Sequence, residues 1–81
     1  MKLRIKAMKQ VEIFKTNVQE ESKAALVIEL LDECYPEFKA NFDLEDEDRI
    51  LRVESIAKQI NGIEIERLLN RMGINCKIFA D

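Results

Sequence analysis

The sequence predicts a single α+β domain in which two helices cover one face of a four-stranded antiparallel sheet. Its 81 residues suit one compact domain. Apolar residues make up 47% and charged residues 36% of the chain, which provides both a core and a solvated surface. Two segments repeat apolar residues at helical spacing, and the segments around them alternate with the period of a strand. These patterns predict strands and helices in one chain without a linker.

The first predicted strand covers about residues 9–16, where apolar and polar side chains alternate. Residues 1–9 form a separate N-terminal segment, which extends this strand, pairs separately or frays. Its basic side chains suit a solvated strand edge better than a phosphate or anionic-lipid patch. Residues 10–81 are therefore expected to form the domain itself.

The first predicted helix covers about residues 18–34. Asn17 is expected to cap it, with Glu20 three residues later as in a capping box. Pro36 prevents the helix from continuing. The residues expected on its apolar face are Ala24, Ala25, Ile28, Leu31 and Tyr35, with Val27 and Leu30 at its margins.

A hairpin is predicted next, because two strand patterns flank a polar turn. Residues 38–44 alternate strictly between apolar and polar side chains, which indicates one buried and one wet face. Residues 45–48 are all acidic and suit the turn. The second strand, at residues 50–54, places Leu51 and Val53 on one face.

Residues 55–60 fit either a continuation of that strand or a connector. Asn61 is then a second expected helix cap, with Glu64 three residues later. Gly73 suits the left-handed conformation at the end of this helix, and a short strand follows at residues 74–79. The apolar stripe of the helix consists of Ile65, Leu68, Leu69 and Met72.

The resulting order of elements is β-α-β-β-α-β, which predicts the ferredoxin-like split βαβ sandwich. Right-handed crossovers then place the strands in the order 4-1-3-2. The second and fourth strands lie at the two edges of this sheet.

The composition of the chain disfavours several classes of function. The net charge is −3, which disfavours a nucleic-acid binder, and no segment is apolar enough to span a membrane. Two cysteines without an export signal are expected to be free thiols in the cytoplasm. The chain has no histidine to serve as a general base and no glycine-rich phosphate loop. We therefore expect no enzyme activity.

Four segments, residues 11–18, 41–45, 50–53 and 65–73, together resemble the heavy-metal-associated domain of copper chaperones and metal-pumping ATPases. The resemblance covers roughly residues 10–81. It implies the same fold, and in that family a C-x-x-C pair after the first strand holds a soft metal ion. The corresponding residues here are Thr16, Asn17, Val18, Gln19, Glu20, Glu21 and Ser22. Because none is a soft ligand, we expect neither a metal site in this loop nor a cofactor.

Cys34 and Cys76 offer an alternative metal site. Cys34 is expected at the far end of the first helix, and Cys76 near the start of the last strand, beside the beginning of that helix. The length of the helix, about 24 Å at 1.5 Å per residue, then prevents the two from sharing an ion in one monomer. Two small buried or half-buried thiols are the simpler interpretation. The alternative function is metal handling, of copper or zinc, with these cysteines acting across a dimer.

The acidic run of residues 43–48 has partial calcium-loop spacing, but Asp48 stands where that loop needs glycine, so a solvated hairpin tip fits better. Phe14 and Phe79 are expected together on the open sheet face. They form a candidate surface for a protein partner or a homodimer, and the edge strand at residues 38–44 is a second one. The main functional hypothesis is a small non-catalytic interaction module; a ligand-sensing domain is a weaker alternative.

Overall fold

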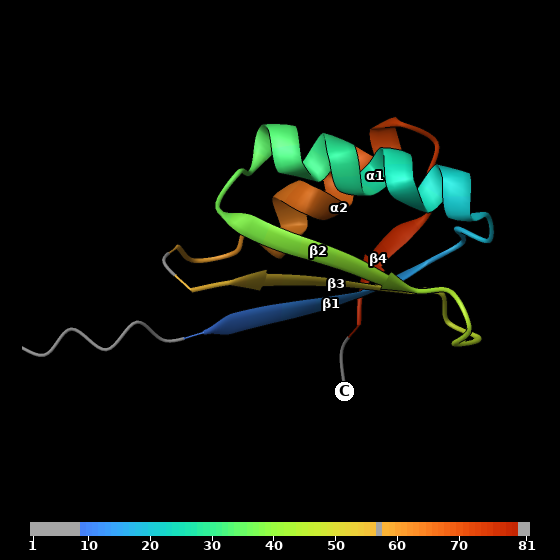
Figure 1. Cartoon of the computed structure of the whole chain (residues 1–81), viewed down its shortest axis with the longest axis horizontal. Helices are drawn as coiled ribbons and strands as arrows, with labels where there is room; N and C mark the ends of the chain where they lie inside the picture. The colour runs from blue at the N-terminus through green and yellow to red at the C-terminus, as the bar shows by residue number, and fades with distance from the viewer. Residues whose placement is uncertain (1–8, 57, 80–81) are drawn as a thin grey trace, which may run out of the picture.

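The computed structural model describes residues 9–56 and 58–79, so the N-terminal segment expected as a strand extension lies largely outside the described residues. Its four strands form one antiparallel sheet in the order β2-β3-β1-β4. This is the predicted 4-1-3-2 order read from the opposite edge, and both helices lie on one face of the sheet (Figure 1). The predicted ferredoxin-like α+β fold is therefore confirmed. Its elements are β1 (Gln10–Thr16), α1 (Glu21–Cys34), β2 (Phe38–Asp43), β3 (Ile50–Ser55), α2 (Gly62–Arg71) and β4 (Cys76–Ile78).

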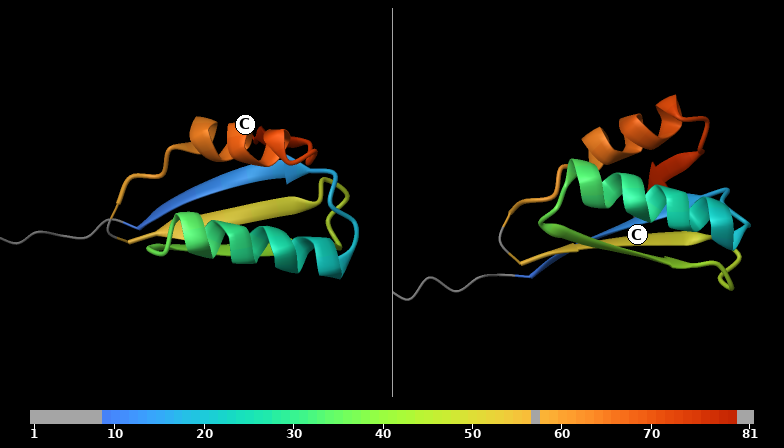
Figure 2. Two further views of the ribbon diagram at one scale, coloured as in Figure 1. Left: turned by 90° about the horizontal axis from the view of Figure 1, so that it is seen from above. Right: turned by 45° about the horizontal axis from the view of Figure 1, so that its top comes forward.

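The two helices divide the sheet between them. Helix α1 lies along the edge strand β2, and α2 lies along the opposite edge strand β4 (Figure 2). Each half of the molecule therefore consists of one helix and one edge strand, joined by the central strands β1 and β3. Among the described residues, neither helix is long and apolar enough to cross a membrane.

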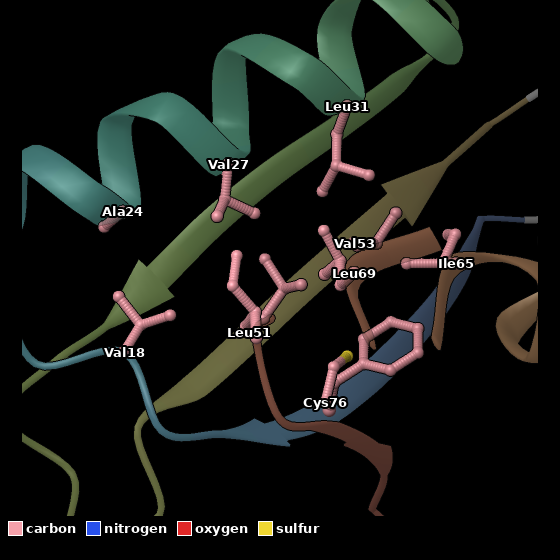
Figure 3. Packing of buried hydrophobic residues seen from close by; sticks show 11 residues of the cluster. Val18, Ala24, Val27, Leu31, Leu51, Val53, Ile65, Leu69 and Cys76 are labelled. Atoms are coloured by element: carbon pink, nitrogen blue, oxygen red, sulfur yellow. The ribbon is translucent and has the colours of Figure 1, made fainter. Parts of the chain in front are cut away.

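The core lies between the helices and the sheet. Phe14 of β1 pairs with Leu51 on one side and Ile78 on the other, and its side chain is completely buried. In Figure 3 the side chains of Val27 and Leu31 point from α1 toward the sheet. Full burial of one such side chain contributes about 1.5–3 kcal/mol, so this layer is the main source of stability. The buried apolar residues are Phe14, Val18, Ala24, Val27, Leu31, Leu51, Val53, Ile65, Leu69, Ile74 and Cys76.

Helix α1 begins later than the sequence predicts. Its N-cap is Glu20, whose side chain makes no capping hydrogen bond, and the expected cap Asn17 instead accepts a bond from the Asn75 N–H at 3.1 Å. Val18 is completely buried in the core. These tertiary contacts hold residues 17–20 as a loop. The buried face also differs from the prediction, because Ala25 is exposed.

Helix α2 begins and ends as predicted. The Asn61 side chain accepts the Glu64 N–H at 3.2 Å, which confirms the cap. Gly73 has a φ of 83°, in the left-handed region. The N–H of Gly73 bonds to the Asn70 carbonyl at 3.1 Å, and that of Ile74 bonds to the Leu69 carbonyl at 3.0 Å. This pair of bonds is a Schellman motif, and it leads the chain directly into β4.

The acidic run forms the predicted turn between β2 and β3. The Asp46 carboxylate accepts the Asp48 N–H at 2.8 Å, and Arg49 has a φ of 47°. The Arg49 guanidinium donates to the Leu44 carbonyl. This local bonding closes the hairpin, and β3 then extends one residue beyond the prediction, to Ser55.

Candidate interaction surface

The two aromatic residues expected on the open face lie on opposite sides of the sheet. Phe14 is buried beneath the helices, so its expected place on the open face is wrong. The pairing of Phe14 with Leu51 puts its side chain on the helix side. Phe79 is half-buried, and its N–H donates to the Ile13 carbonyl at 2.8 Å. The structure therefore does not bring Phe14 and Phe79 together into one surface.

Charged side chains occupy much of the face away from the helices. The Lys15 ammonium lies 4.7 Å from the centre of the Phe79 ring. The Glu54 carboxylate accepts from Lys9 at 2.8 Å and from Arg52 at 3.2 Å. The bond from Lys9 is the main cause that lowers the pKa of Glu54. In the described part of the chain, this face carries some paired charges beside Phe79 and the exposed Val11, and it has no stacked aromatic rings.

Residues 16–22 correspond to the loop that carries the metal ligands in heavy-metal-associated domains, and here they are hydrogen-bonded to other parts of the protein. The Thr16 hydroxyl donates to the Arg49 carbonyl at 2.6 Å and accepts the Val18 N–H at 3.2 Å. The Asn17 N–H donates to the Asn75 carbonyl at 3.2 Å. The loop thus serves to join β1, the hairpin and β4.

The remaining positions of that loop lead into the helix. Gln19 and Glu20 are exposed, and Glu21 and Ser22 form the first turn of α1. Their side chains are oxygen and amide groups, which soft ions such as Cu(I) do not prefer.

The two cysteines have opposite environments. Cys34 is exposed at the end of α1, so the expectation of a buried or half-buried thiol is wrong for this residue. Cys76 is buried and lies among the core side chains in Figure 3. Burial, and then the nearby Glu66 carboxylate, raise the pKa of the Cys76 thiol to about 12. With only 4% of its surface exposed, the Cys76 thiol is poorly accessible to an ion in solvent. The described residues contain no group of three potential ligands arranged for a metal ion.

Side chains of α2 close the β4 edge of the sheet. The Asn70 amide donates to the Cys76 carbonyl at 3.1 Å and accepts the Cys76 N–H at 3.4 Å. The Glu66 carboxylate accepts the Ile78 N–H at 2.9 Å. These bonds occupy backbone groups that an added strand would need, so β4 is protected against edge pairing.

Glu66 and Asn70 were missed by the sequence reasoning. Their spacing of four residues places both on one side of α2, beside the strand that follows. Two polar side chains on the flank of a helix that packs along a short edge strand could have indicated this role.

The β2 edge has a different structure. The side chains of Phe38, Ala40 and Phe42 on its helix side are only half-buried. The Phe38 N–H bonds to the Tyr35 carbonyl at 3.0 Å, away from β3. Because alternate residues of an edge strand direct their backbone groups outward, Ala40 and Phe42 also direct theirs away from the sheet. Among the described residues, no hydrogen bond closes the outward groups of Ala40 and Phe42.

A shallow hollow of mixed apolar and polar lining runs beside this open edge. Ala25 and Ile28 of α1 line one side of it, and Phe42 and Leu44 line the other. Glu21, Asp43 and Glu45 also belong to its lining. The hollow exposes part of the core margin next to unpaired backbone groups, a combination that suits an added strand.

A second hollow lies between the two helices. Cys34 and Tyr35 line it from the end of α1, and Arg67 and Arg71 line it from α2. The Tyr35 hydroxyl donates to the Glu64 carboxylate at 2.6 Å, which links the two helices. Partial burial, and then this bond, raise the pKa of Tyr35 to about 12.

Comparisons of the chain with models of protein families, with curated proteins and with solved structures gave no significant match.

Proposed function

We propose that this protein is a small, non-catalytic interaction module that binds a protein partner through the β2 edge of its sheet. The difference between the two sheet edges carries this proposal. The β4 edge is closed by Asn70 and Glu66, whereas Ala40 and Phe42 leave the β2 edge open. An extended segment of a partner can add to such an edge by main-chain hydrogen bonds.

The chemistry of the chain supports a binding role over a catalytic one. Without histidine, a nucleophile such as Ser22 or Cys34 has no imidazole base. The resemblance to a heavy-metal-associated domain supports a degenerate member of that class, because Thr16–Ser22 offers no thiolate or imidazole ligand. We propose that the module acts in the cytoplasm, without a cofactor, and on a protein surface and not on nucleic acid or a membrane.

Capture of bound proteins from extracts of the source cells tests the proposal, with wild-type chain and two variants of Ala40. Ala40→Pro removes an N–H that points away from β3, so the sheet is retained while the outward bond is lost. Ala40→Val keeps the N–H and is the matched control. A partner that wild type and Ala40→Val hold and Ala40→Pro loses supports the β2 edge. A partner held equally by all three contradicts it.

A further inference from the structure

We infer that the occupant of the β2 edge is a second copy of this chain, paired antiparallel about a twofold axis through Asn41. This inference rests on the proposed use of the β2 edge and names the partner. The two copies would then share one continuous sheet, with both α1 helices on the same side. The backbone of β2 allows this arrangement, and its charges and apolar margin favour it.

The backbone restricts the register. Ala40 and Phe42 direct their N–H and C=O groups outward, whereas Asn41 directs its groups toward β3. In an antiparallel pair, outward-directed residues must face each other. With Asn41 opposite Asn41 of the second copy, Ala40 faces Phe42 of that copy, and Phe42 faces its Ala40. Both pairs then exchange hydrogen bonds.

The charges on the open face favour the same register. Lys39, Asn41 and Asp43 are the exposed side chains of β2. In the register centred on Asn41, Lys39 faces Asp43 of the second copy, and by symmetry Asp43 faces its Lys39. Opposite charges directly across an antiparallel pair are stabilising. A shift of two residues in one direction places Asp43 opposite Glu37, which is repulsive. A shift in the other direction places Lys39 opposite Glu45, which lies beyond the end of β2, and leaves Asp43 opposite Asn41.

The apolar margin of the core is completed in this arrangement. On the helix side, Phe38 faces Leu44 of the second copy, and Ala40 faces Phe42 of that copy. All four of these residues are half-buried in the single chain and pack against its core. Phe42 and Leu44 also line the hollow beside α1, so Ala40 and Phe38 of the second copy would lie next to it. Burial of these groups supplies the hydrophobic part of the association.

One pair of like charges falls at each end of the interface. Glu37 faces Glu45 of the second copy, beyond the limits of β2. Glu37 is already paired with Lys58 at 3.1 Å, and both glutamates are exposed. Exposed charges at a rim contribute little, so the central Lys39–Asp43 pairs decide the register.

Charge reversal on the full chain tests this inference by sedimentation equilibrium. Lys39→Asp and Asp43→Lys each replace two attractive pairs with two repulsive ones, and each is expected to weaken the dimer by about tenfold or more. The double variant K39D/D43K restores opposite charges and is expected to return the Kd toward that of wild type. Lys77→Asp, on the same face at the opposite edge, is the matched control and leaves the Kd unchanged.

A disulfide tests the position of the twofold axis. In a Cys34→Ser background, Asn41→Cys places two thiols directly opposite at about 4.5 Å between Cα atoms, within disulfide range. Lys39→Cys is the control, because its two copies would stand about 13 Å apart, four residues along the strands. Mild oxidation is expected to cross-link the Asn41→Cys variant only.

The outcomes separate this inference from the proposed function. A monomeric wild type, a double variant that stays weaker than either single one, or equal cross-linking at both positions overturns the dimer. If the chain is monomeric yet captures another protein in an Ala40-dependent manner, the proposed function stands and the second copy is rejected. A monomer whose partner is retained by Ala40→Pro contradicts both.

Discussion

The two halves of this molecule each consist of a helix packed on an edge strand, but they differ in the helix cap, in the bonding of the strand edge and in the burial of the cysteine. In the α2–β4 half, Asn61 caps the helix, Asn70 and Glu66 close the strand edge, and Cys76 is buried. In the α1–β2 half, the helix has no side-chain cap, Cys34 is exposed and the strand edge is open. The difference shows that one edge of the sheet has its outward backbone groups bonded, whereas in the described part of the chain those of Ala40 and Phe42 at the other edge are not.

The largest expected difference between the halves concerns their two thiols at alkaline pH. Burial raises the pKa of Cys76 from 9.0 to about 12, so the unfolded chain loses this proton first. The stabilisation is complete below pH 9 and is lost as the pH rises from 9 to 12, by about 4 kcal/mol in total. Denaturant unfolding at a series of pH values measures this loss.

Variants of the two cysteines assign the alkaline effect. Cys76→Ala is expected to flatten the fall in unfolding free energy, most clearly between pH 9 and 10. The pKa of Tyr35 is also raised, from 10.0 to about 12, but this group affects the unfolding free energy only above pH 10. Cys34→Ala, at an exposed site, is the matched control and is expected to keep the fall between pH 9 and 10. An unchanged slope in Cys76→Ala would contradict the burial of this thiol.

A smaller effect is expected when the closed edge is opened. Asn70→Ala removes both hydrogen bonds to Cys76 and is expected to lower the unfolding free energy by about 1–3 kcal/mol. Asn41→Ala on β2 is the matched control, because Asn41 is also exposed but its side chain makes no hydrogen bond with the described residues. Chemical denaturation of dilute protein measures both. Equal losses in the two variants would remove the distinction between the edges.

The smallest effect is expected at the two helix starts. Asn61→Ala removes the cap of α2 and is expected to cost about 1 kcal/mol. Glu20→Ala at the start of α1 removes no capping bond, so a change of only a few tenths of a kcal/mol is expected. Thermal or denaturant unfolding compares them, and a larger loss for Glu20→Ala would reverse this part of the comparison.

Local signals made most of the fold predictable from sequence. The strict alternation at residues 38–44 and the acidic turn predict the hairpin, and the capping pattern at Asn61 with Gly73 sets both ends of α2. In each case the pattern and the contacts that enforce it lie within a few residues. These parts of the prediction are confirmed.

The parts of the fold that were predicted wrongly depend on contacts between residues far apart in the sequence. Asn17 has the side chain of a helix cap, but its bond to Asn75, 58 residues away, holds it in the loop. Strand β1 has Val11 and Ile13 on one face and only Phe14 as a large apolar residue on the other, so alternation favoured the wrong buried face. Only the pairing with both neighbouring strands decides which face the helices cover.

Amide hydrogen exchange at the two edges tests the central claim most directly, in concentrated wild-type protein and in the Lys39→Asp variant. In the variant, the amides of Ala40 and Phe42 are expected to exchange rapidly, while those of Cys76 and Ile78 exchange slowly behind Asn70 and Glu66. In the wild type all four amides are expected to be protected. Rapid exchange at Ala40 and Phe42 in both samples, or equally rapid exchange at Cys76 and Ile78, would contradict the account.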